Sequence, residues 1–297
     1  MTLIGRSKVV YSMSRANRPA AEVEPGEKVV FQTEDCYSGM VRTTRDRFPA
    51  SKMDLANPAT GPVFVRGAKP GDVLAVKILE VKPVGKATML TGPGKGPLGY
   101  ELARDEVVKL PMARGFIRLG GRRLRMRPMI GVIGVAPRAK AIANPWPGEH
   151  GGNMDCNVIR AGAVVYLPVY VRGALLALGD VHAAQGAGEI GICAAEARAR
   201  VTVRIGICRE RMVTPAVRFG GDLYIIASGR TLDRAEGLVL AKAFRYLTGI
   251  AGMGQHEAVR LMSLACDLEV CQVVDPLKTM RVRIPGKCLP RAMGYGT

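Results

Sequence analysis

Short runs rich in valine and isoleucine alternate with glycine and proline along most of the chain, up to about Pro215. The runs read KVVFQT, GPVFVRG, DVLAVKILEVKPV, MIGVIGVA, AVVYLPVYV and ARVTVRIGI. Short apolar runs separated by turn formers at regular spacing are typical of a β-sandwich or barrel rather than of a parallel α/β sheet. We therefore predict a mainly β chain, with a jelly-roll-like β-sandwich domain over residues 1–215.

The pattern changes after Pro215. A strand-like run, DLYIIAS, is followed by Thr231 and then by AEGLVLAKAFRYLTGI, whose apolar residues recur at helical spacing. Thr231 suits a helix N-cap, because its hydroxyl can accept a hydrogen bond from a free backbone N–H of the first turn. A second helical segment, GQHEAVRLMSLACD, precedes two alternating runs, LEVCQVVDP and MRVRIPG. We predict a smaller α+β domain over residues 216–297, a β-α-α-β unit with one further strand.

Size and charge narrow the class of protein. The chain has 297 residues, 48% hydrophobic and 5% aromatic, which is enough for one large or two modest cores of aliphatic side chains. A formal net charge of +18 raises the question of a nucleic-acid partner. Basic residues are, however, spread from Arg6 to Arg291. The one dense patch, residues 114–127, alternates like a half-exposed strand pair and offers only Phe116 for base stacking. The sequence therefore disfavours nucleic-acid binding.

The cysteines and the apolar segments indicate the compartment. The chain has 7 cysteines, no CxxC pair and no secretory signal at its start. Reduced thiols in the cytoplasm are therefore expected. The most apolar segment, Ala161 to Leu178, is interrupted by Pro168 and Arg172 and does not read as a membrane span. We expect a cytoplasmic protein without a membrane partner.

Three polar turns interrupt the strand pattern: TEDCYSG (33–39), PGEHGGNMD (147–155) and LGDVHAAQGAGEIGICAAE (178–196). In the third turn, Asp180 and His182 are two residues apart. In an extended segment such side chains point to the same side and can converge on one ligand. One imidazole with one or more carboxylates suits zinc or another borderline divalent ion. A lone Asp-x-His pair also arises by chance. Two of the three histidines lie in glycine-flanked turns, which brings a metal site level with the chance interpretation.

Other features have two interpretations. Gly151 and Gly152 could present backbone N–H groups to an oxyanion, or they could form a tight turn before the next strand. Cys36 and Cys156 each follow an aspartate, and a buried structural thiol is favoured over a nucleophile at both positions. His256 lies in the second helical segment and is predicted to be a surface residue. The sequence has no GxSxG or P-loop motif, and no GxGxxG in the strand-to-helix setting that binds dinucleotides.

Four segments, taken in order, resemble the acetamidase/formamidase family. They are NPATGPVFVRGAKPGDVLAVKI, IGVIGVAP, HGGNMDCNVIRAGAVVYLPVYVRGALLALGDVHAAQGAGE and QVVDPLKTMRVRIP. The resemblance extends from about Thr33 to Pro285, and the combination is specific although no single segment is. It implies a β-rich sandwich with an α+β C-terminal part, assembled as a homodimer or higher homo-oligomer. It also implies hydrolysis of short linear amides, such as formamide and acetamide, to a carboxylate and ammonia.

The resemblance further implies a bound divalent metal, zinc or alternatively calcium, and assigns roles within the three turns. The implied metal-binding residues are Asp35, Asp155, Asp180 and His182. The implied catalytic residues are Glu189, Glu196 and His150. The small amide would be bound by Gly151, Gly152, Asn153 and Gln185. In this scheme a metal-activated water attacks the amide carbon, and Glu189 or Glu196 moves the proton.

One position departs from the family pattern. The usual QGDGE reads QGAGE here, with Ala187 in place of the acid. If that acid binds metal or acts as a base in relatives, its loss would weaken metal binding, alter metal preference or abolish the activity. The alternative hypothesis is therefore a divergent paralogue of the same fold, which binds a small ligand without hydrolysing it.

Overall fold

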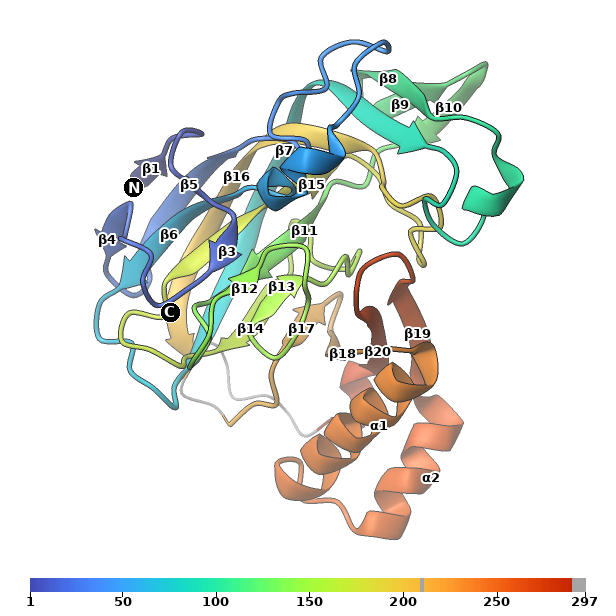
Figure 1. The fold of residues 1–297 in the computed structure, drawn as a ribbon. Coiled ribbons are helices and arrows are strands. Elements are labelled where there is room, and N and C mark those ends of the chain that lie inside the picture. Colours follow the sequence, from blue (N-terminus) through green and yellow to red (C-terminus); the bar gives the residue numbers. More distant parts are fainter. Residues whose placement is uncertain (209–210, 290–297) are drawn as a thin grey trace.

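The computed structural model describes residues 1–208 and 211–289. Strands make up most of its regular structure, and two helices pack together near the C-terminal end of the chain (Figure 1). The prediction of a mainly β chain with helices in its C-terminal part is confirmed. Within the described ranges, no helix is both long and apolar enough to cross a membrane.

The elements follow one another in this order. The first strands are β1 (Thr2–Ile4), β2 (Val9–Val10), β3 (Ser12–Met13), β4 (Ala21–Val23), β5 (Lys28–Thr33), β6 (Ala59–Val65) and β7 (Val73–Thr91). The middle strands are β8 (Glu106–Ala113), β9 (Phe116–Leu119), β10 (Arg122–Arg125), β11 (Met129–Gly134), β12 (Ile142–Ala143), β13 (Gly151–Asn153), β14 (Val164–Pro168), β15 (Leu176–His182) and β16 (Glu196–Cys208). The C-terminal elements are β17 (Ala216–Phe219), β18 (Asp222–Gly229), α1 (Leu232–Gly249), α2 (Gln255–Ala265), β19 (Asp267–Gln272) and β20 (Lys278–Ile284).

The long strands β7 and β16 form the centre of the β-rich part. They pair antiparallel over most of their lengths, and β16 pairs on its other edge with β5. Their sequences alternate as half-buried strands should: Leu74, Val76 and Ile78 of β7 are fully buried, whereas Lys77 between them is exposed. The apolar faces of these strands and of β5 and β6 contribute to the largest hydrophobic core.

Strand β15 leads into the third polar turn. All seven of its residues are buried, and it pairs with β11, β6 and the start of β16. Because every side chain of the strand is buried, the run LALGDVH is apolar except at Asp180 and His182. A polar side chain at the end of such a strand is held inside the protein, so the fold itself places the Asp180–His182 pair in the interior.

The C-terminal part has the predicted β-α-α-β-β order. Strand β18 pairs with β17 and β20, and β20 pairs with β19. The N-cap of α1 is Thr231, whose hydroxyl accepts the backbone N–H of Arg234 at 3.2 Å, as predicted. Helix α1 buries one face, including Ala235 and Val239, in a second apolar core shared with β18 and β20. Helix α2 carries His256, which is exposed as expected.

The basic patch at residues 114–127 is an exposed hairpin. Strands β9 and β10 pair antiparallel, and every residue of β10 is exposed. The guanidinium of Arg123 lies 4.3 Å from the centre of the Phe116 ring, so the one aromatic ring of the patch is already covered by an arginine. The predicted strand pair is confirmed.

Candidate metal centre

The centre is built around His182 at the end of β15. Asp180 Oδ1 lies 3.4 Å from His182 Nε2. Both side chains are almost fully buried. Asp180 has a φ of 50°, so the backbone leaves the extended region there. The two side chains therefore meet through a local break in the strand, which simple strand alternation does not describe.

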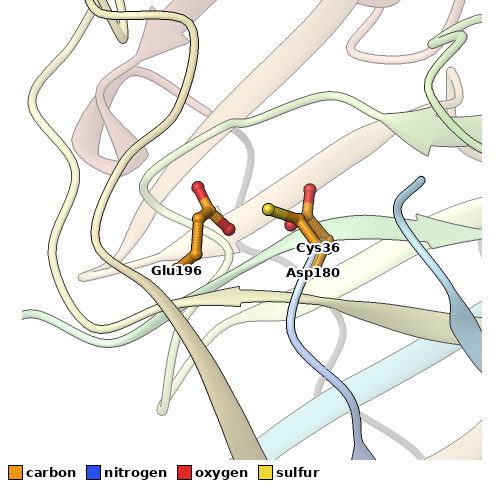
Figure 2. Close-up of side chains that lie close together, drawn as sticks. All are labelled: Cys36, Asp180 and Glu196. Atoms are coloured by element: carbon orange, nitrogen blue, oxygen red, sulfur yellow. The ribbon is translucent and has the colours of Figure 1, made fainter. Parts of the chain in front are cut away.

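A second carboxylate lies on the Nε2 side of His182, and a thiol lies close to the two carboxylates. Glu196 Oε2, from the first residue of β16, lies 3.2 Å from His182 Nε2. Cys36 comes from the loop after β5. One ligand-type atom each of Cys36, Asp180 and Glu196 lies within 4.8 Å of the others, and Figure 2 shows these three side chains gathered together from separate segments.

Two further carboxylates lie on the Nδ1 side of the ring. Asp155 Oδ1 and Glu189 Oε1 are 3.7 Å and 3.9 Å from His182 Nδ1, and the three side chains form a second group of possible ligands. Asp275, in the loop between β19 and β20, accepts a hydrogen bond from Asn153 Nδ2 at 3.1 Å. Coulombic repulsion from Asp155 adds to burial in raising the pKa of the Asp275 carboxyl, which places Asp275 beside this group.

Gln185 fixes the orientation of the imidazole. Its Nε2 donates to the backbone carbonyl of Asp155 at 2.7 Å, so its Oε1 faces His182 Nδ1 at 2.8 Å. An amide oxygen can only accept, so Nδ1 carries the hydrogen. The lone pair of a neutral His182 ring is therefore on Nε2, facing Asp180 and Glu196. A histidine that binds metal is typically held through its other ring nitrogen in this way.

Glycine lines the space beneath the carboxylates. A Cβ at Gly131 of β11 would lie 2.6 Å from Asp155 Oδ1 and 3.0 Å from Asp180 Oδ2. Real Cβ atoms do not approach oxygen that closely, so only glycine leaves room for both carboxylates. This answers why the strand MIGVIG has a glycine in its centre, which the sequence pattern alone did not explain.

Burial dominates the electrostatics. It raises the pKa of Glu196 to about 8 and that of Asp155 to about 6, and it holds the pKa of Glu189 well above its usual range. At His182 burial favours the neutral ring, but the adjacent Glu196 and Asp180 outweigh it and raise the pKa well above 6.5. Four of the carboxylates, those of Asp155, Asp180, Glu189 and Glu196, share His182 as a cationic partner.

The donor atoms fit a divalent cation. One oxygen of each of five carboxylates is buried and has no hydrogen-bond partner among the described residues: Asp155 Oδ1, Asp180 Oδ1, Glu189 Oε2, Glu196 Oε2 and Asp275 Oδ2. A buried carboxylate oxygen without a partner lowers the stability of the fold by roughly several kcal/mol, as a buried unpaired ion does. A bound cation supplies the missing partner. The structure thus holds two adjacent groups of side chains that could bind a divalent ion.

The other predicted site residues lie elsewhere. Asp35 belongs to neither group: its Oδ1 accepts the backbone N–H groups of Tyr37 and Gly39, at 3.1 and 3.0 Å. It therefore shapes the loop that carries Cys36. His150 also belongs to neither group. It is 2% exposed, neither ring nitrogen has a partner among the described residues, and burial lowers its pKa to about 4.

The HGGN segment forms a tight turn. Gly151 and Gly152 have φ values of 93° and 80°, and the Gly151 N–H donates to the carbonyl of Gly148 at 3.1 Å. A Cβ at Gly151 would lie 2.3 Å from the carbonyl oxygen of Ile133. Of the two interpretations of this segment, the hydrogen bond favours the turn at Gly151, since that N–H is already used.

Ala187, the departure from the family pattern, is exposed on the turn between Gln185 and Glu189. Its side chain belongs to neither group of possible ligands. The residues that sequence reasoning missed are Cys36 as a ligand-type neighbour, Asp275, and Asn57, whose Nδ2 donates to Asp180 Oδ2 at 3.0 Å. Asn57 and Asp275 occur in the family-like segments NPATGPV and QVVDPLK, which is the signal that could have found them.

Comparison with known proteins identifies the family of this chain. The family model of the acetamidase/formamidase family matches residues 16–146 and 139–226. The chain belongs to the acetamidase/formamidase family. An acetamidase of Mycolicibacterium smegmatis is 26% identical over 244 residues, which cover 59% of this chain and 60% of that protein. The chain spans about three-fifths of the length of the curated relatives it matches most fully.

Solved structures cover more of the chain. The crystal structure of an acetamidase from Bacillus halodurans is 38% identical and superposes with a TM-score of 0.92, covering 95% of this chain and 96% of that one. A predicted acetamidase/formamidase from Thermoanaerobacter tengcongensis is 35% identical, with a TM-score of 0.93 and 96% coverage of both chains. The resemblance noted from the sequence is thereby confirmed.

Proposed function

We propose that the protein hydrolyses the C–N bond of short linear amides, of the formamide and acetamide type, to a carboxylate and ammonia with the help of a divalent cation. Relatives named acetamidase and formamidase support the reaction class. The observation that carries the proposal is the cluster of buried carboxylates around His182, each with an unpaired oxygen.

The cation would be held on the Nε2 side of His182 by Asp180 and Glu196. When bound there it supplies a Lewis acid that polarises the amide carbonyl and lowers the pKa of a water molecule. Asn57 holds Asp180 through its side-chain amide, and Gln185 holds His182. Both ligands are thus fixed before a substrate arrives, which limits the reorganisation needed during the reaction.

Glu189 is the group we assign to proton transfer. Its Oε2 is buried and has no hydrogen-bond partner in the described chain, and its other oxygen faces the Nδ1 side of His182. Burial raises the pKa of Glu189 well above its usual range and so makes its carboxylate a stronger base. The carboxylate can take a proton from the attacking water and return it to the leaving nitrogen. Glu189 Oε2 would therefore carry the proton that converts the amide nitrogen into ammonia.

The burial of the centre supports a small substrate. Cys36, Asp155, Asp180, His182 and Glu196 are all 7% exposed or less. A substrate that reaches them must be compact, and formamide and acetamide fit this requirement better than long-chain or peptide amides. The exposed position of Ala187 gives no reason to favour the non-hydrolytic alternative. Zinc as the cation, assembly as a homo-oligomer and a cytoplasmic location remain predictions.

The proposed function is tested by ammonia release from formamide, acetamide and a panel of longer amides, with zinc supplied. We expect release from the shortest amides, and Glu189→Gln should lower kcat at least about 100-fold, the scale of general acid–base catalysis. Glu257→Gln is the matched control, because Glu257 is exposed on α2, and should leave the rate unchanged. An inactive wild-type protein on all short amides, or full activity in Glu189→Gln, would contradict the proposal.

A further inference from the structure

Cys36 is held in place by the same residue that holds Asp180. The backbone N–H of Asn57 donates to the Cys36 carbonyl at 2.9 Å, and the Asn57 side chain donates to Asp180 Oδ2 at 3.0 Å. Asn57 has a φ of 51°, a left-handed conformation that asparagine tolerates better than most residues. One residue therefore fixes the thiol loop and a carboxylate of the centre relative to each other.

The loop is fixed from its other side by Asp35. The Asp35 carboxylate accepts two backbone N–H groups from the residues that follow Cys36. Cys36 is 7% exposed and lies at the edge of a small apolar cluster with Tyr37, Val41 and Val107. A purely structural thiol would gain from apolar neighbours on all sides, whereas Cys36 has the carboxylates of Asp180 and Glu196 on one side.

The Nε2 nitrogen of His182 is the one able to bind a cation. Gln185 occupies His182 Nδ1, which leaves Nε2 toward Asp180 and Glu196, at 3.4 and 3.2 Å. Donor atoms around a tetrahedral zinc ion, with bonds of about 2.0 to 2.3 Å, are roughly 3.3 to 3.8 Å apart. The two distances from His182 Nε2 to the carboxylate oxygens are close to that range. A cation on the Nδ1 side would instead compete with Gln185 for the ring.

We propose that Cys36 is a ligand of the cation, so that the centre is a four-donor site made of Cys36 Sγ, Asp180, His182 Nε2 and Glu196. Thiolate with imidazole and carboxylate is a donor set that suits zinc, whereas calcium and magnesium take oxygen ligands. This assignment rests on the cation invoked in the proposed function and specifies its ligands and its chemical class.

Cobalt(II) reports the ligand directly. We expect the metal-free protein reconstituted with one equivalent of Co²⁺ to show an intense near-ultraviolet band from thiolate-to-cobalt charge transfer, together with the visible bands of four-coordinate cobalt. Cys36→Ser should lose the charge-transfer band. Cys193→Ser is the matched control, because the Cys193 thiol is also buried and near Glu196 but bonds the backbone of Leu90. It should retain the band.

The wild-type spectrum decides the proposal even if a variant fails to fold. A wild-type cobalt protein without a thiolate band, or a band lost in Cys193→Ser and kept in Cys36→Ser, would overturn it. The spectrum requires no turnover, so the assignment of Cys36 as a ligand can fail while amide hydrolysis stands, and the other way round. A thiolate band without ammonia release would leave Cys36 as a ligand and reject the amidase. Ammonia release by a cobalt protein without the band would support the amidase and reject Cys36 as a ligand.

Discussion

Gln185 shows how a single side chain can set the chemistry of the centre without belonging to either group of possible ligands. It donates to the backbone carbonyl of Asp155 and accepts from His182 Nδ1. The first bond decides which end of the amide faces the ring, and the second decides which ring nitrogen is free. The sequence placed Gln185 on the substrate side. That assignment stays a prediction, and the contacts of Gln185 with His182 and Asp155 add a positioning role that can be tested.

We expect Gln185→Leu to weaken zinc binding about 10- to 100-fold, the usual cost of losing a partner of a metal-binding histidine. The variant removes the hydrogen bonds of Gln185 to His182, Asp155 and Cys271 with little change in volume. A competition titration of the metal-free protein with a chromophoric chelator measures the affinity. Gln185→Glu keeps an acceptor for His182 Nδ1 and should bind more tightly than the leucine variant. Equal affinity in wild type and Gln185→Leu would rule out the positioning role.

Gly131 gives a second prediction at the residue scale. A methyl group there would press on Asp155 and Asp180, so Gly131→Ala should destabilise the fold by about 1 to 3 kcal/mol, the usual cost of overpacking, and displace at least one carboxylate. Urea unfolding and zinc affinity both report the change. Gly121→Ala is the control, because no atom lies within 4 Å of a Cβ at that position. Equal stability and equal zinc affinity in the two variants would contradict the steric role of Gly131.

At the scale of elements, helix α1 is tied to the loop that precedes β13. Lys242 of α1 is buried, and its Nζ donates to Glu149 Oε2 at 2.8 Å and to the carbonyl of Thr214 at 3.0 Å. Glu149 itself is largely exposed, with 62% of its side chain accessible. The lysine therefore matters more than its partner, because it satisfies a backbone carbonyl in addition to the ion pair.

Lys242→Ala should lower the free energy of unfolding by about 2 to 3 kcal/mol, because it removes a packed stem and leaves carbonyls without a donor. Glu149→Ala should cost no more than about 1 kcal/mol, as is usual for an ion pair with an exposed member. Urea denaturation of the two variants gives the comparison. A larger loss for Glu149→Ala would show that this account of the contact is wrong.

Helices and strands could be predicted where apolar residues recur at a clear helical or strand spacing. Helix α1, its Thr231 cap and the β9–β10 hairpin follow from local pattern. Asp180 and His182 were predicted to converge because alternate residues share one face of a strand. They do converge, but through a left-handed residue at Asp180 that no pattern shows. Cys36 and Asp275 escaped prediction because distant segments bring them to the centre.

At the scale of the whole molecule, the buried carboxylates should make the stability of the metal-free protein depend on pH. Burial raises the pKa of Glu196 to about 8 and of Asp155 to about 6, above the values near 4 of an unfolded chain. The folded protein then holds protons that the unfolded chain has released. Stability is therefore present at low pH and is lost as pH rises through these folded values. The raised pKa of His182 acts in the same direction.

We expect the Tm of chelator-treated protein to fall between about pH 5 and pH 8, and bound zinc to reduce the fall by pairing with the ionised carboxylates. Thermal unfolding followed by circular dichroism measures this. Glu196→Gln removes one of the titrating groups and should have a shallower dependence than wild type. A Tm that rises over this range, or an identical slope in the variant, would contradict the assignment of the buried acids.

The division into domains at residue 215 and the jelly-roll-like sandwich remain predictions. Strand β17, just after that boundary, pairs with β14 before it as well as with β18 after it. The net charge of +18 also has no structural explanation beyond an exposed hairpin of arginines. The domain division, the sandwich topology and the net charge are properties of the whole chain. Neither the local sequence pattern nor the geometry of the metal centre determines them.

The central claim is that the carboxylates around His182 hold a cation that the reaction requires. The most direct measurement is elemental analysis of the purified protein, paired with ammonia release from formamide before chelation, after chelation and after return of zinc. We predict one or two divalent ions per chain, loss of ammonia release on chelation, and recovery with zinc. Full activity in protein shown to be free of metal would contradict the claim.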